Sequence, residues 1–218
     1  LFVAACIACA HTGGMSKPAS YSFSIDIPEG WRKIDNNRYL FVTKESPFRQ
    51  YIMVQNRPIG RSFRNTKKKM QKEMFPEEAA QIIVDELISD QNLVNLRILD
   101  NAPTTIKGHA GFKILYTYKD SEGRVYKTLY YGFIKEDTFF NLRFTAMDGV
   151  YFQRDIGDFR NILKSFQIIK ASHRLGGDHD IGIAGMHPEH FHLVPFLGLE
   201  LDIKVIDHHV GYPCARVA

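Results

Sequence analysis

The chain has 218 residues, 44% of them hydrophobic and 24% charged, which is the ordinary balance of a globular protein and enough for one domain with appendages. Its formal net charge of +4 is too small to indicate nucleic-acid binding without a concentrated basic patch. The one candidate patch, residues 61–72, holds a single aromatic, Phe63, and predicts a solvated loop leading into a helix. Contact of this patch with anionic lipid or an acidic partner is the alternative.

The first residues, LFVAACIACAHTGG, are small or apolar and contain two cysteines. Val3-Ala4-Ala5-Cys6 resembles the lipobox of bacterial lipoproteins, which implies that Cys6, or alternatively Cys9, carries lipid. Several acyl chains hold a protein to a bilayer better than one. The resemblance therefore predicts a signal remnant and tether over residues 1–20, and a lipid-anchored protein of the bacterial cell envelope that faces the periplasm. An ordinary cleaved signal or a truncated membrane helix stays open.

The body of the chain starts with strands. Residues 21–31 alternate between apolar and polar side chains before the turn at Pro28 to Gly30, and Trp31 is expected to cap the core. Residues 38–43 and 48–58 predict two further strands.

A helix is predicted over residues 76–91. Pro76 suits the first helical position, Glu77 and Glu78 suit the positive helix start, and apolar residues recur at helical spacing. Strands follow at 93–99, 110–120, 124–135 and 138–146, joined mainly by tight turns that make the sheet antiparallel.

A second helix is predicted over residues 150–165, with an apolar and aromatic face. Helices packed on one face of an antiparallel sheet give an α+β domain of two layers. The predicted domain spans residues 21–170.

The segments FSIDIPEGW, TIKGHAGFKILYTY and DFRNILKSFQI resemble the photosystem protein PsbP, its bacterial relatives and the DcrB group, which share the Mog1-type fold. The resemblance covers about residues 21–170 and rests on structural residues. It implies an antiparallel sheet covered by two main helices. It also implies a small non-enzymatic domain, often lipid-tethered, that acts in binding or assembly.

Few residues of the body suggest chemistry. His109, the one histidine between residues 21 and 170, is expected in a surface turn, and Asp85 and Glu86 are expected on the solvated face of a helix. Five tyrosines crowd two neighbouring strands, and cross-strand packing is the favoured interpretation. The alternative is a partner surface. Its candidate residues are Tyr116, Tyr118, Tyr130 and Tyr131.

Beyond Lys170 the composition changes, and seven of the nine histidines lie there. Imidazole and carboxylate groups are ligands for zinc or a similar divalent metal. The candidate ligands of this tail, residues 171–218, are Asp178, His179, Asp180, His187, His190, His192, Asp207, His208 and His209. The run LELDIKVIDHH also resembles DHH phosphoesterases, over about residues 176–213 only.

The sequence thus predicts a non-enzymatic, lipid-anchored envelope protein that binds an unknown envelope partner, without nucleic acid and without a cofactor in its body. The alternative is metal binding, or metal-dependent phosphoesterase activity, carried by the tail. A non-catalytic tail and an extracytoplasmic ligand binder that uses the sheet face also stay open.

Overall fold

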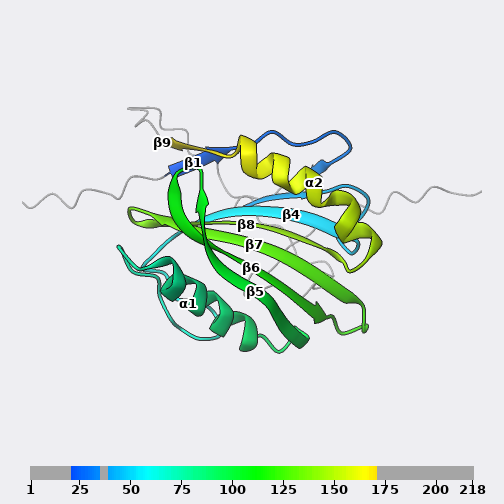
Figure 1. Cartoon of the computed structure of the whole chain (residues 1–218), viewed down its shortest axis with the longest axis horizontal. Coiled ribbons are helices and arrows are strands. Elements are labelled where there is room, and N and C mark those ends of the chain that lie inside the picture. The colour runs from blue at the N-terminus through cyan, green and yellow to red at the C-terminus, as the bar shows by residue number, and fades with distance from the viewer. Residues whose placement is uncertain (1–20, 35–38, 171–218) are drawn as a thin grey trace, which may run out of the picture.

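A computed structural model describes residues 21–34 and 39–170 of the chain, and it shows a curved antiparallel sheet with one helix against each face (Figure 1). The seven strands of this sheet lie in the order β2-β3-β4-β8-β7-β6-β5, and each neighbouring pair is antiparallel. The α+β class and the antiparallel sheet covered by two helices are confirmed.

Most of the sheet is built from hairpins. Tight turns join successive strands, as at Asp120 to Gly123, where the Asp120 carboxylate accepts backbone N–H groups of the turn. The strands are β2 (Arg32–Ile34), β3 (Leu40–Thr43), β4 (Gln50–Pro58), β5 (Val94–Ile106), β6 (His109–Lys119), β7 (Val125–Lys135) and β8 (Thr138–Met147).

Helix α2 (Val150–Ser165) covers the β4–β8 part of one face, through the apolar residues that the sequence placed on one side of it. Phe152, Phe159 and Ile162 are buried against β4 and β8, and the Phe159 ring lies 5.8 Å from that of Phe144. Trp31 caps this core as predicted, because it is 6% exposed and its indole N–H donates to the Asp158 carboxylate at 2.8 Å.

A charged cluster also fastens α2 to the sheet. The fully buried Asp155 carboxylate accepts hydrogen bonds from Lys44 at 3.1 Å and Arg154 at 2.7 Å, and the Gln50 amide approaches it at 3.4 Å. Burial alone would raise the pKa of Asp155, but the hydrogen bonds from Arg154 and Lys44 outweigh it and hold the pKa below its usual value.

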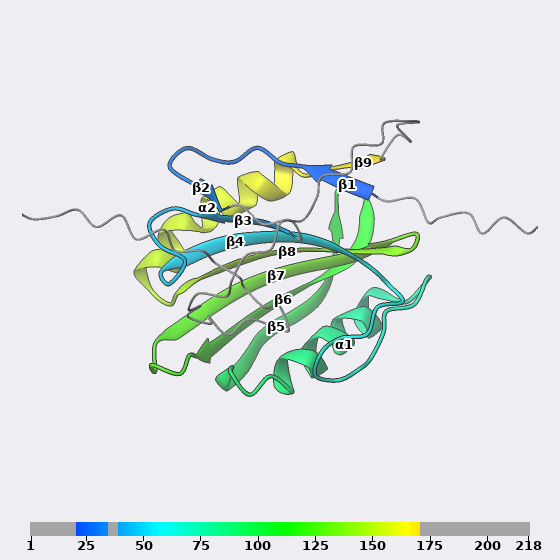
Figure 2. The same cartoon turned by 180° about the vertical axis from the view of Figure 1, so that it is seen from behind.

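Helix α1 (Pro76–Ile88) packs on the opposite face, over β5, β6 and β7 (Figure 2). Its buried residues, among them Ile83 and Leu87, contact Phe112, Ile114 and Tyr116 of β6 in a separate core. The expectation of two layers with both helices on one face is therefore wrong. Strands β7 and β8 bury side chains in both cores, and β6 buries side chains in the α1 core and packs the half-buried Leu115 against the α2 core, so the domain has three layers.

The two ends of the described domain pair with each other outside the main sheet. Strand β1 (Tyr21–Ser24) lies antiparallel to β9 (Gln167–Lys170), with Tyr21 opposite Lys170. Phe23 and Ile168 pack against the α2 core, so this small ribbon belongs to the α2 side. The predicted strand over 21–31 is thus shorter than expected, while β2, β9 and the second half of β5 were not predicted.

Candidate functional site

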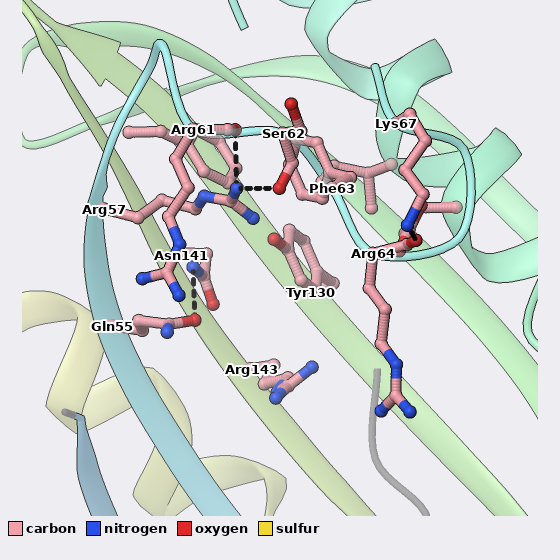
Figure 3. Close-up of a pocket in the computed structure, with 13 residues that line it drawn as sticks. Gln55, Arg57, Arg61, Ser62, Phe63, Arg64, Lys67, Tyr130, Asn141 and Arg143 are labelled. Atoms are coloured by element: carbon pink, nitrogen blue, oxygen red, sulfur yellow. Dashed lines mark hydrogen bonds between the residues drawn. The ribbon is translucent and has the colours of Figure 1, made fainter. Parts of the chain in front are cut away.

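A pocket of about 370 Å³ opens on the α1 side of the sheet, beside the loop that leads from β4 towards α1 (Figure 3). Its floor comes from β4, β7 and β8, one wall comes from α1, and the rim comes from the loop 61–67. The lining residues are Gln55, Arg57, Arg61, Ser62, Phe63, Arg64, Lys67, Ile83, Glu86, Tyr130, Phe139, Asn141 and Arg143.

Strand register brings the polar floor together. Gln55 of β4 lies opposite Asn141 of β8, and Arg143 of β8 lies between Met53 of β4 and Tyr130 of β7. The Asn141 amide donates to the Gln55 carbonyl at 3.5 Å, and Asn141 and Arg143 are each 3% exposed. An Arg143 N–H contacts the Met53 sulfur at 2.7 Å. These side chains therefore present amide and guanidinium groups at the bottom of the pocket.

Arg57 links the floor to the rim. Its guanidinium donates to the backbone carbonyls of Arg61 at 2.7 Å and Ser62 at 3.0 Å, and it lies 4.0 Å from the centre of the Phe63 ring. Burial lowers the pKa of Arg57, as does the charge of Arg61, whereas Tyr130 and Glu86 raise it. An arginine stays protonated through such shifts, so Arg57 is a fixed positive charge in the pocket.

Glu86 of α1 holds the loop in place. Its carboxylate accepts hydrogen bonds, all of 2.9 Å, from the Asn65 N–H, the Thr66 N–H and the Thr66 hydroxyl. The side chain is 3% exposed, so the expectation that Glu86 is solvated is wrong, because the loop folds over it. Its neighbour Asp85 reaches the surface and pairs with Lys68, which lowers the pKa of Asp85.

The pocket is strongly electropositive. Its lining contains five cationic side chains and the single carboxylate of Glu86, whose two oxygens already accept hydrogen bonds from the loop. In the described part of the chain, Arg57, Arg61, Arg64 and Lys67 form no ion pair with a carboxylate. Guanidinium groups recognise carboxylate and phosphate through paired hydrogen bonds, so the arrangement is suited to binding an anion.

The tyrosines of the predicted partner surface lie mostly inside the protein. Tyr116, Tyr118 and Tyr130 are 2%, 8% and 3% exposed, because α1 and neighbouring rings cover the face of β6 and β7 that carries them. The interpretation of an exposed tyrosine face is therefore wrong for these three residues, which pack across neighbouring strands. Tyr130 also lines the pocket. Tyr131 points to the other face, where it is half-buried 6.0 Å from the Phe159 ring.

His109 opens β6 rather than lying in a surface turn. It is half-buried, and its ring stacks on that of Phe133 at 5.2 Å. Burial lowers the pKa of His109, and the charge of Lys135 adds to this effect. The side chain therefore packs as a largely apolar ring at the edge of the α2 core.

The other predicted sites lie outside the described residues. These are the lipid-attachment candidates Cys6 and Cys9 and every candidate metal ligand between Asp178 and His209. Within residues 21–34 and 39–170, three or more histidine, cysteine or acidic side chains nowhere gather closely enough to hold a metal ion. In the same residues, neither helix has the length and apolar character needed to cross a bilayer.

Fold and pocket together define a three-layer α+β domain that carries an electropositive binding pocket. A scan of protein-family models finds no match to the chain, and a search of curated proteins finds none either. The resemblance of the tail to DHH phosphoesterases therefore gains no support from these comparisons.

Solved structures do resemble the chain. LpqN, involved in cell envelope biogenesis of Mycobacterium tuberculosis, is 15% identical with a TM-score of 0.49, over 71% of this chain and 87% of LpqN. The cyanobacterial PsbP of Synechocystis is 11% identical with a TM-score of 0.47, over 74% of this chain and 99% of that one. The Ran-binding protein Mog1p of Saccharomyces cerevisiae is 9% identical with a TM-score of 0.45, over 70% and 96% respectively. The similarity is one of fold.

Sequence reasoning found the rim of the pocket but not its floor. Arg61, Arg64 and Lys67 belong to the basic segment that the sequence singled out, with an acidic partner or lipid as the alternative to a solvated loop. The floor residues Asn141 and Arg143 fall within the strand predicted over residues 138–146, where the sequence alone marks neither as a binding residue. Their position in β8, which is central and covered on both faces, is the signal that distinguishes them.

Proposed function

We propose that the protein is a non-enzymatic binding protein of the bacterial cell envelope, whose domain captures an anionic ligand or an acidic group of its partner in the electropositive pocket. The observation that carries this proposal is the set of cations, Arg57, Arg61, Arg64 and Lys67, that form no ion pair within the described residues and surround a concave site with amide donors at its floor. Isolated surface charges are ordinary, but cations from a strand and a loop that converge on one cavity are a typical anion site.

The envelope location is supported by the lipobox-like sequence before Cys6, and LpqN, a protein of envelope biogenesis, has a similar fold. In this proposal lipid on Cys6 tethers the domain, while the pocket opens on the face of the sheet opposite the terminal ribbon β1–β9. A tethered domain could then present its pocket to partners. Metal binding by the tail stays a prediction.

Anion binding is tested with the full chain by nuclear magnetic resonance. We expect sulfate and citrate to shift the amide signals of Arg57, Tyr130 and Asn141, with saturation at millimolar concentrations. Replacing both Arg61 and Arg64 with glutamate should abolish these shifts, whereas Lys69→Glu, an exposed change in the same loop that does not line the pocket, should keep them. Shifts spread evenly over the surface, or equal loss in both variants, would refute the pocket as the binding site.

The tether is tested separately in cells. Cys6→Ser should release the protein from the membrane fraction and stop the incorporation of a labelled fatty acid, and Cys9→Ser should do neither. Full membrane association of both variants would reject lipid attachment without affecting the pocket.

A further inference from the structure

The charge of the pocket indicates what kind of anion it selects. Four of the cationic side chains that line it, Arg57, Arg61, Arg64 and Lys67, form no ion pair within the described residues, and its one carboxylate, Glu86, is committed to the backbone of Asn65 and Thr66. A carboxylate ligand brings one negative charge, so it would leave most of the charge of these four side chains unmatched. A phosphate monoester brings close to two charges at neutral pH, and the difference matters most where water is partly excluded.

The directions from which the donors reach the pocket also favour a phosphate. Arg57 reaches the pocket from β4 and is held by two carbonyl groups, whereas Arg61 and Arg64 reach it from the loop, as Figure 3 shows. A planar carboxylate offers two oxygens, which one guanidinium can satisfy. A phosphate offers three oxygens arranged around phosphorus, which suits donors that come from several sides.

We propose that the pocket binds the phosphate group of a phosphomonoester and discriminates against carboxylates, an inference that rests on the proposed anion-binding function. Arg57 supplies the fixed, pre-oriented contact, and Arg61 and Arg64 close over the outer oxygens. Asn141 and Gln55 at the floor donate amide hydrogens to the group that carries the phosphate. The phosphate can belong to a soluble metabolite or to a lipid headgroup, because both present the same chemistry.

The first experiment measures calorimetric affinities of the full chain for glycerol 3-phosphate, glycerate and succinate. Glycerol 3-phosphate should bind at least about tenfold more tightly than glycerate, and more tightly than succinate, which has two charges but no tetrahedral group. Equal affinity for the three ligands would overturn the phosphate assignment and leave the proposed anion binding intact. If none of these three ligands binds, and sulfate and citrate do not bind either, both the phosphate assignment and the proposed anion binding are refuted.

Variants locate the effect. The double change Arg61→Ala and Arg64→Ala should reduce the affinity for glycerol 3-phosphate at least about tenfold. Arg57→Lys keeps the charge but loses the paired donors, so it should reduce the ratio of the affinities for glycerol 3-phosphate and glycerate. Lys69→Ala should change neither value. An unchanged preference in Arg57→Lys would overturn the role given to that guanidinium.

A second arm distinguishes the source of the phosphate. Short-chain phosphatidic acid below its micelle concentration has the headgroup of glycerol 3-phosphate with acyl chains added. Tighter binding of this lipid assigns the site to a membrane headgroup, and equal binding assigns it to a soluble phosphate ester. Failure of the lipid to bind while glycerol 3-phosphate does would exclude the membrane source and keep the soluble one.

Discussion

At Gly111 of β6, the backbone of a neighbouring strand approaches more closely than a side chain would allow. A Cβ atom built there would lie 2.5 Å from the carbonyl oxygen of Gly132 and 2.8 Å from the Cβ of Phe133. Neither atom can move away by a change of side-chain rotamer, since one belongs to the backbone of β7 and the other is bonded directly to it. The glycine is therefore required by the spacing of β6 and β7.

We predict that Gly111→Ala lowers the free energy of unfolding by about 1–3 kcal/mol, the usual cost of overpacking. Gly157→Ala is the matched control, because Gly157 is exposed within α2 and a Cβ there meets nothing within 4 Å. That change should raise the free energy of unfolding by about 0.5–1 kcal/mol. Urea unfolding monitored by circular dichroism measures both, and a neutral Gly111→Ala would contradict the close packing.

Residue identity alone predicted some of this structure and not the rest. Trp31 was expected to cap the core because a large aromatic ring next to a strand is favourably buried, and it is buried. Glu86 was expected on the solvated face of its helix because charged groups are rarely buried alone, and Arg143 was not singled out as a buried residue. Their burial depends on partners distant in sequence, the loop at 65–66 for Glu86 and Met53 for Arg143, which no local pattern reveals.

At the scale of the elements, α2 is attached to the sheet by charge as well as by apolar contact. We predict that Asp155→Asn lowers the free energy of unfolding by about 2–3 kcal/mol at pH 7. A fully buried ion pair that loses one partner costs ~3–5 kcal/mol, and here Lys44 and Arg154 still reach water, which reduces the loss.

The pH dependence gives this prediction a specific sign. The pKa of Asp155 is lower in the folded protein than in the unfolded chain. Its contribution to the free energy of unfolding is therefore present above the unfolded pKa of about 3.9 and is lost as the pH falls through the folded pKa. The difference in stability between the wild type and Asp155→Asn should therefore be constant from pH 7 to about 5 and shrink below about 4. A difference that stays constant down to pH 2 would contradict the ionised cluster.

Helix α1 positions the loop that forms the pocket rim, through Glu86. We predict that Glu86→Gln speeds trypsin cleavage after Arg61, Arg64 or Lys67 roughly tenfold. The two carboxylate oxygens of Glu86 accept hydrogen bonds from three donors of the loop, whereas an amide has only one acceptor oxygen. Glu77→Gln, the same chemical change at an exposed position of α1, should leave cleavage unchanged. Equal cleavage rates in both variants would mean that the loop is held by other contacts.

The elements most accurately predicted were those with strong periodicity, namely both helices and the strands β6, β7 and β8. Strands β2 and β9 are short and acquire their structure from pairing with β3 and β1, so their own residues carry little signal. The side of the sheet on which each helix packs was also beyond the sequence. A helix shows which of its own faces is apolar, but it does not show which face of the sheet it will cover.

At the scale of the whole molecule, one sheet serves two cores. Phe140, Leu142 and Phe144 of β8 point to α2, whereas Phe139 on the same strand points to α1. Loss of either core therefore removes the support for strands that the other core needs, and we expect the domain to unfold as a single cooperative unit.

We predict that Leu87→Ala, a change in the α1 core, shifts the unfolding midpoint reported by Trp31 fluorescence in the α2 core as far as the midpoint reported by far-ultraviolet circular dichroism. Leu87 is fully buried, so a loss of about 2–5 kcal/mol is expected. An unchanged Trp31 midpoint would show that the α1 layer unfolds independently.

The pairing of Tyr21 with Lys170 has a practical consequence for engineering. A domain that begins and finishes at the same corner can be spliced into an exposed loop of a host protein without stretching the host, since the insertion points need to separate by only the width of two strands, ~5 Å. The described domain is accordingly suited to insertion within another protein chain.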